Sequence, residues 1–142
     1  MILLDTNVVS ELMRPTPSRA VVTWLSGRSR RQALSAVSVF EIRYALARLE
    51  DATRREALSD AFTQLVDEFA GLAILDLDQP AASAAATLRA TLERAGVSRS
   101  TPDLLIAGTA IVAGATLATR NAKDLSGAGL DVVDPWRDER RV

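Results

Sequence analysis

The sequence predicts an α/β protein in which a mainly parallel central sheet of about five strands lies between two layers of helices. Short apolar segments alternate with longer segments whose apolar residues recur at helical spacing. This alternation is typical of sheets whose parallel strands are connected by helices that cover both faces. A length of 142 residues fits one domain over residues 1–136, followed by a charged tail over residues 137–142.

The first strand, over residues 2–4, is apolar and ends at Asp5. A short helix is expected from Thr6 to about Met13. In open α/β sheets, ligands bind outside the carboxyl ends of the strands, so Asp5 is a candidate site residue. Aspartate is also a favourable helix N-cap, and this stretch alone leaves both interpretations open.

The next segments continue the alternation. Pro15 and Pro17 predict a turn after the first helix. Ser18 is the expected N-cap of a second helix that ends near residue 26. A short apolar segment over residues 33–36 then predicts the second strand.

Two helices are expected in the middle of the chain. The first runs from Ser38 to about residue 50, and Ser38 precedes Glu41 by three residues, which is the capping-box arrangement. Glu41 therefore has a structural interpretation as well as a functional one. The second helix covers residues 54–70, and Gly71 is its expected stop.

The second half of the chain predicts two further helices and three strands. Asp78 is the expected cap of an alanine-rich helix that begins near Pro80 and ends at Gly96. Ser100 or Thr101 begins a helix that is apolar on most sides. The remaining predicted segments are a strand over residues 73–77, this apolar helix to residue 113, a strand over 115–119, a polar loop over 124–126 and a strand over 130–133.

Composition narrows the possible chemistry. The chain has neither cysteine nor histidine, which excludes disulfides, Cys/His zinc sites and Ser-His-Asp triads. Catalysis must therefore use carboxylates, hydroxyls or metal-bound water. The formal net charge is −1, with 17 basic and 18 acidic residues, so binding to nucleic acid requires a local basic patch.

Neither a secretion signal nor a membrane span is expected. No basic segment precedes the short apolar run at the N-terminus, so a cytoplasmic location is the default. The longest uncharged stretch, residues 104–119, is interrupted by Gly108 and Gly114. It is also shorter than the roughly 20 residues that a spanning helix needs.

Three acidic residues occupy comparable places in the predicted fold. Asp5 ends the first strand, Glu41 follows the second, and Asp103 lies in the first turn of the helix before the fourth strand. In a parallel sheet these positions meet at one edge, and Asn121 just past the fourth strand adds a fourth oxygen donor. Each acid also has a structural explanation, as a cap, a capping-box partner or a helix-dipole partner.

Carboxylates held close together repel one another unless a cation lies between them. Mg²⁺, for which Mn²⁺ can substitute, prefers oxygen ligands, and a site of this kind supports hydrolysis of a phosphodiester. The sequence has no Walker-type loop and no Gly-x-Gly-x-x-Gly motif after a strand. Nucleoside triphosphate and dinucleotide binding therefore lack their usual motifs.

These motifs together resemble the PIN-domain ribonucleases, particularly the VapC-type toxins of toxin–antitoxin pairs and their FitB-like branch. The resemblance implies a three-layer α/β/α PIN-like fold and an endoribonuclease that depends on Mg²⁺. The matching segments, in order along nearly the whole chain, are residues 1–8, 10–11, 35–41, 102–107, 118–125 and 134–136.

The resemblance also implies roles for individual residues. Asp5, Glu41 and Asp103 form the acidic metal site, and Asn121 stands where a fourth acid is common in the family. Asn121 or Asp124 is therefore the candidate fourth ligand. The residues expected to position water, substrate or phosphate are Thr6, Thr119, Arg120 and Arg43.

The partners implied are an RNA substrate, a VapB/FitA-like antitoxin and a second copy of the chain in a homodimer. Operator DNA is expected only through the antitoxin complex. Two other functions compete with the ribonuclease toxin. One is a PIN-like binding module with weak or absent catalysis, because Asn121 is uncharged. The other is a phosphotransfer enzyme with Asp5 as nucleophile, which ranks last because a second acid two residues later is missing.

Overall fold

A five-stranded sheet forms the centre of the protein. The computed structural model describes residues 1–27, 31–68, 73–125 and 128–137. The strand order is β3-β2-β1-β4-β5, and all four neighbouring pairs are parallel, which confirms the predicted class. The strands are β1 (Ile2–Leu4), β2 (Gln32–Ser35), β3 (Ala73–Leu75), β4 (Thr116–Ala118) and β5 (Val132–Val133).

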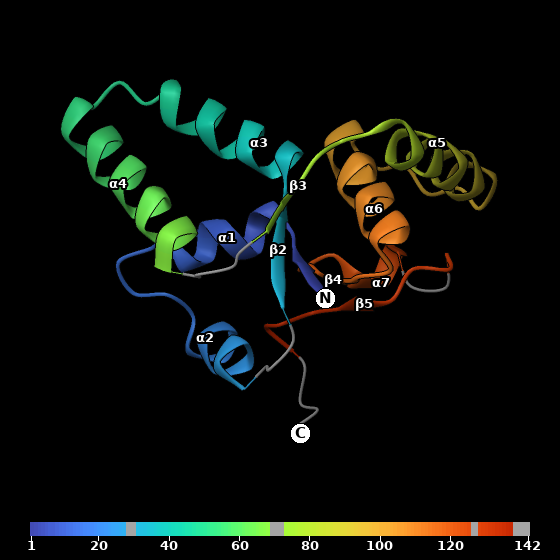
Figure 1. Ribbon diagram of the computed structural model, residues 1–142, viewed down its shortest axis with the longest axis horizontal. Helices are drawn as coiled ribbons and strands as arrows, with labels where there is room; N and C mark the ends of the chain where they lie inside the picture. Colours follow the sequence, from blue (N-terminus) through green and yellow to red (C-terminus); the bar gives the residue numbers. More distant parts are fainter. Residues whose placement is uncertain (28–30, 69–72, 126–127, 138–142) are drawn as a thin grey trace.

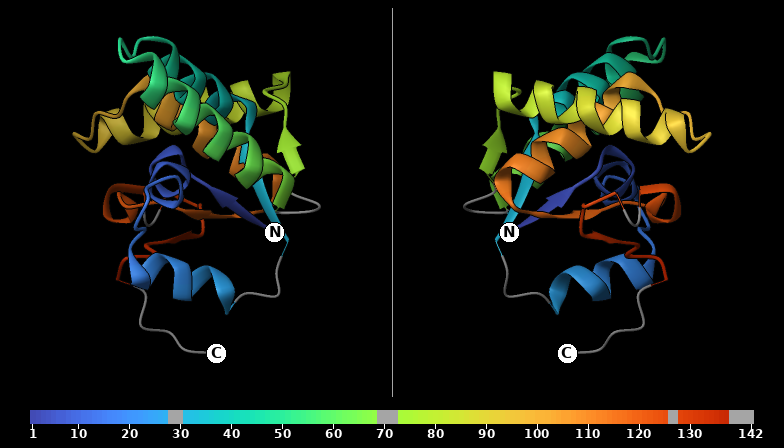
Figure 2. Two further views of the ribbon diagram at one scale, coloured as in Figure 1. Left: turned by 90° about the vertical axis from the view of Figure 1, so that its left-hand side faces the viewer. Right: turned by 90° about the vertical axis from the view of Figure 1, so that its right-hand side faces the viewer.

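Seven helices lie within the described residues and surround this sheet (Figure 1). Helices α5 and α6 pack closely against each other, and α4 packs beside α3 (Figures 1 and 2). The helices are α1 (Thr6–Leu12), α2 (Arg19–Ser26), α3 (Ala36–Ala47), α4 (Ala52–Glu68), α5 (Gln79–Arg94), α6 (Thr101–Ala113) and α7 (Ala122–Leu125).

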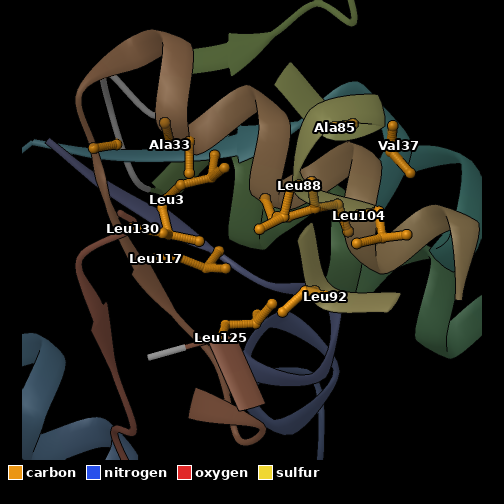
Figure 3. Packing of buried hydrophobic residues seen from close by; sticks show 14 residues of the cluster. Leu3, Ala33, Val37, Ala85, Leu88, Leu92, Leu104, Leu117, Leu125 and Leu130 are labelled. Carbon is orange, nitrogen blue, oxygen red and sulfur yellow. The ribbon is translucent and has the colours of Figure 1, made fainter. Parts of the chain in front are cut away.

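Two hydrophobic cores cover the two faces of the sheet, because successive side chains of a strand point to opposite faces. Leu3 of β1 belongs to the core that includes Leu88 of α5 and Leu104 of α6 (Figure 3). Its neighbours Ile2 and Leu4 belong to the second core, which α1, α2 and α3 complete. The predicted three-layer arrangement is therefore confirmed.

Helix α6 is held closely against α5 and ends sharply before β4. A Cβ atom at Gly108 would lie only 2.8 Å from the Cβ of Ala85, so only glycine permits this approach. The helix ends at Gly114, whose φ of 62° is left-handed. Its N-terminus is capped by Ser100, as predicted, and its first turn carries Asp103.

The predicted capping box at Ser38 is wrong. Helix α3 begins at Ala36, because the Ser35 side chain accepts a hydrogen bond from the backbone N–H of Val37 (3.0 Å). Strand β2 correspondingly ends at Ser35, one residue earlier than expected. Ser38 lies inside the helix and is fully buried, so Glu41 is not a capping-box partner.

Further boundaries differ from the predicted ones. Residues 124 and 125 belong to α7 and not to a polar loop, because buried Leu125 anchors this short helix in the core. Helix α4 begins at Ala52, where Asp51 accepts hydrogen bonds from the backbone of the first turn. Strands β3, β4 and β5 are shorter than predicted. The expected stop at Gly71 and residues 138–142 of the tail lie outside the described residues.

Among the helices of the described ranges, none combines the length and hydropathy that crossing a bilayer requires.

Candidate active site

The three predicted acids line one cavity of about 690 Å³ at the carboxyl edge of the sheet. Asp5 directly follows β1, Glu41 lies in the second turn of α3, and Asp103 lies in the first turn of α6. Three basic side chains share the lining, namely Arg14, Arg54 and Arg120. The parallel topology therefore brings together carboxylates from three separate segments and surrounds them with guanidinium groups.

Asp5 is both a helix cap and a member of the acidic site. Its Oδ1 accepts the backbone N–H of Thr6 (2.8 Å), which caps α1, and its Oδ2 accepts the hydroxyl of Thr119 (2.6 Å). The two interpretations of Asp5 are thus compatible. Only 6% of the residue is exposed, so both hydrogen bonds fix the carboxylate in a largely dry position.

Burial raises the pKa of Asp5 above the usual aspartate value, because desolvation disfavours the charged form. The hydrogen bonds from Thr119 and Thr6 act in the opposite direction and lower this pKa. The negative charge of Asp103 raises the pKa, whereas the positive charge of Arg99 lowers it. A cation in the cavity would favour the ionised form of Asp5.

Thr6 orients Glu41. The Thr6 hydroxyl donates a hydrogen bond to Oε1 of Glu41 (2.7 Å) and lies 3.0 Å from Oγ of Ser38. Since Ser38 is fully buried inside α3, this network fixes the Glu41 carboxylate next to the start of α1. Thr6 and Thr119, both predicted as positioning residues, thus hold two different acids of the site.

Arg99 contacts two carboxylates at one side of the site. One of its terminal nitrogens lies 3.5 Å from Oδ2 of Asp103, and the other lies 3.1 Å from Oδ2 of Asp124. The sequence reasoning missed Arg99, although its spacing of four residues from Asp103 was a usable signal. Asp124 is therefore joined to the acidic cluster through Arg99 and does not itself line the cavity.

The remaining predicted residues differ in their placement. Arg120 lines the cavity and lies over the ring of Trp136, 4.3 Å from its centroid. Arg43 instead lies over Phe62 and donates to Ser59, so it packs on α4 and does not join the acids. Asn121 has an exposed side chain outside the cavity lining, and its backbone N–H donates to Thr119 Oγ1 (3.2 Å).

One face of α1 supplies cavity residues that the sequence reasoning did not select. Glu11 is only 6% exposed, accepts from Arg14 (3.1 Å) and accepts from Nε1 of Trp136 (3.3 Å). Ser10 lines the cavity one helical turn after Thr6, which was predicted, and Arg14 lines it from just beyond the end of α1. The spacing of four residues from Thr6 to Ser10 was the available signal, whereas the contact with Trp136 depends on the tertiary fold.

The sequence matches a known protein family over most of its length. The PIN domain matches residues 2–127, which is most of the chain. The chain belongs to the PIN-domain family.

Two curated relatives of this PIN-domain protein are named as a toxin and as a ribonuclease. This chain is 37% identical over 140 residues to Toxin FitB of Neisseria gonorrhoeae, and the match covers 97% of this chain and 100% of FitB. It is 36% identical over 138 residues to VapC ribonuclease Y4jK of Sinorhizobium fredii, covering 96% and 98% of the two chains. The solved structure of FitAB bound to an IR36 DNA fragment is similar over all of both chains, with 36% identity and a TM-score of 0.86.

The donor set of this PIN-domain site fits a hard divalent cation. Within the described ranges, no three acidic side chains form a group compact enough to enclose an ion by themselves. Mg²⁺ usually binds through one or two carboxylates and keeps several waters, so the spread of Asp5, Glu41 and Asp103 around an open cavity suits it. The absence of histidine and cysteine from the chain also favours a hard cation over a softer one.

A second, more apolar cavity adjoins the acidic one. It has a volume of about 590 Å³ and lies between α1, α3 and α4. Leu46, Leu49 and Leu58 contribute to its wall. We call it the apolar groove. The two cavities share five lining residues, which are Thr6, Ser10, Arg14, Glu41 and Arg54.

Proposed function

We propose that this PIN-domain protein is the toxin of a toxin–antitoxin pair and acts as an endoribonuclease that requires Mg²⁺, with Mn²⁺ as a substitute. The observation that carries this proposal is the acidic cavity, whose lining includes Asp5, Glu41 and Asp103 together with three arginines. The names of the FitB and VapC relatives support the toxin and ribonuclease parts of the proposal.

Asp5 and Asp103 are the residues best placed to hold the cation, because both line the acidic cavity, Asp5 from the end of β1 and Asp103 from the first turn of α6. A Mg²⁺ ion held by these residues would supply polarisation of the phosphate and a lower pKa for a coordinated water. Thr119 and Thr6 keep the carboxylates of Asp5 and Glu41 in fixed orientations. Glu41 is the remaining carboxylate and serves to orient or deprotonate the attacking water.

Arginines of the cavity provide the phosphate contacts. Arg54 and Arg120 line the acidic cavity from α4 and from the segment after β4. A guanidinium group matches the geometry of a phosphate and stays charged at all relevant pH values. We therefore assign these two arginines to the RNA backbone. Arg43 has no such role, because it packs against Phe62 of α4.

The apolar groove is the proposed seat of a VapB/FitA-like antitoxin. Because it shares Thr6, Ser10 and Arg14 with the acidic cavity, a segment bound in the groove would also restrict access to the acids. The similarity to FitAB bound to DNA supports a complex that reaches operator DNA through the antitoxin. The homodimer implied by the resemblance stays a prediction.

The decisive test uses antitoxin-free protein and a mixed-sequence RNA with Mg²⁺, with Mn²⁺ or with EDTA. Cleavage is expected with either cation and absent with EDTA. Asp5→Asn should reduce cleavage at least about 100-fold, because it removes a charged ligand. Its circular dichroism should be retained, since asparagine also caps helices well.

Asp67→Asn is the matched control, because Asp67 is exposed on α4 and lies outside the cavity lining. This variant should cleave at the wild-type rate. A folded, antitoxin-free wild type that leaves every RNA intact with both cations would contradict the proposal. That result would favour the binding module instead.

A further inference from the structure

Arg99 is a buried arginine shared between two acids. Its side chain is only 8% exposed, with contacts of 3.5 Å to Asp103 and 3.1 Å to Asp124. The contacts join the segment before α6, the first turn of α6, and α7. A buried guanidinium requires charged partners, so this position is defined by Asp103 and Asp124 together.

The charge of Arg99 reaches the acidic cavity. Asp103 lines that cavity together with Asp5, and a terminal nitrogen of Arg99 lies 3.5 Å from Oδ2 of Asp103. One cationic side chain therefore already offsets part of the repulsion between the two carboxylates.

The side of the site next to Asp103 offers little to a second divalent cation. Oδ2 of Asp103 already faces Arg99, and Asp124 is directed to the same guanidinium. Asn121 is neutral and its side chain is exposed outside the cavity lining. A second cation would have to approach a fixed positive charge, with few free carboxylate oxygens to bind it.

We propose that Arg99 is a positioning residue that fixes the carboxylate of Asp103 and takes the place of a second divalent cation, so that the site binds one cation per chain. This inference rests on the proposed metal-dependent function and specifies the metal count and the residue that sets it.

Calorimetric titration of the full-length, antitoxin-free chain with MnCl₂ tests the proposal independently of cleavage. Wild type should bind one Mn²⁺. Arg99→Met leaves Asp103 and Asp124 without their cation, so it should bind a second Mn²⁺ or bind the first at least about tenfold more tightly. Arg99→Lys keeps the positive charge beside Asp103 and Asp124, so it should retain one Mn²⁺, with an affinity within about threefold of wild type.

Asp124→Asn should change the Mn²⁺ affinity in the opposite direction to Arg99→Met. It removes a negative charge but keeps Arg99, so it should weaken Mn²⁺ binding by about threefold or more. Circular dichroism and thermal unfolding check that each variant is folded. If Arg99→Met does not fold, Arg99→Lys and Asp124→Asn still decide the question.

Binding of two Mn²⁺ by wild type, or identical titrations for wild type and a folded Arg99→Met, would overturn the inference. So would unchanged or tighter binding by Asp124→Asn. A wild type that binds no Mn²⁺ would instead contradict the proposed function itself. The failure of the inference and the failure of the proposed function therefore give different results.

Discussion

Asp5 shows how one side chain serves structure and site together. Its two carboxylate oxygens have separate partners, the backbone of Thr6 and the hydroxyl of Thr119. The first bond begins α1 and the second ties the end of β1 to the end of β4. The energetic cost of this arrangement is a buried charge, which is why the pKa of Asp5 is raised.

This raised pKa predicts how stability depends on pH. Between the unfolded value of 3.8 and the higher folded value, the native state binds more protons than the unfolded state. The contribution of Asp5 to the free energy of unfolding therefore decreases as pH rises through that window. Above the window this contribution no longer changes with pH. Asp5→Asn lacks the effect, so its stability relative to wild type should increase across the window and then level off.

Urea unfolding in EDTA at several pH values measures this difference, with Asp67→Asn as the control that should show no such trend. A difference between Asp5→Asn and wild type that is independent of pH would contradict the prediction. Adding Mn²⁺ near neutral pH should raise the melting temperature of wild type but not that of Asp5→Asn, because a ligand of the native state stabilises it.

Several site residues were predictable because their roles follow from position next to a strand. Asp5, Thr6, Thr119 and Arg120 all come directly after β1 or β4, and a parallel sheet places such residues at one edge. Arg99 has no such position. Its role appears only when the fold brings α7 next to the segment before α6, so a single sequence gives its spacing from Asp103 but not its contact with Asp124.

At the scale of elements, the close contact between α5 and α6 determines where Asp103 lies. Asp103 is in the first turn of α6, and this helix is held against α5 at Gly108. A Cβ atom there would collide with the backbone oxygen of Ala81 and with Ala85. Backbone atoms cannot move aside as the end of a long side chain can, so α5 and α6 would have to separate.

Gly108→Ala is therefore expected to destabilise the protein. Overpacking at the upper end of its usual range costs about 3 kcal/mol. The higher helix propensity of alanine over glycine offsets about 1 kcal/mol of this. The free energy of unfolding in urea should fall by about 2 kcal/mol. Gly27→Ala is the control, because its Cβ would lie 3.6 Å from the nearest atom and its φ is −81°.

The control should change stability by less than about 0.5 kcal/mol. Equal stability of wild type and Gly108→Ala would contradict this expectation, because it would mean that α5 and α6 separate without cost.

The start of α3 was predicted wrongly because it too depends on tertiary packing. Ser35 and Ser38 are both suitable caps by composition, and the tertiary fold decides between them by burying Ser38 against Thr6.

At the scale of the whole molecule, the near-neutral charge leaves the proposed RNA binding to local contacts. The net charge of −1 provides no long-range attraction, whereas Arg14, Arg54 and Arg120 line the acidic cavity. With single-stranded RNA, each phosphate contact contributes about −0.7 to the slope of log affinity against log salt. The two arginines assigned to RNA, Arg54 and Arg120, therefore predict a slope of about −1.4.

Fluorescence anisotropy with labelled RNA and the Asp5→Asn protein measures this slope without cleavage. Arg54→Ala or Arg120→Ala should each make it shallower by about 0.7. Arg89→Ala is the control, because Arg89 is exposed on α5 and pairs with Glu93. A slope near zero, or an equal effect of Arg89→Ala, would contradict the assignment of the arginines to RNA.

Under the proposed function, the wall shared by the two cavities also limits how the toxin can evolve. Thr6, Ser10, Arg14, Glu41 and Arg54 line both the acidic cavity and the apolar groove. A mutation at any of them that frees the toxin from its antitoxin also alters the catalytic surface. Mutations that weaken antitoxin binding but keep toxicity would have to lie at groove positions outside this wall, such as Ala45, Ala57 and Leu58. An antitoxin that contacts the residues the toxin must keep for activity would therefore retain its binding when other toxin residues mutate.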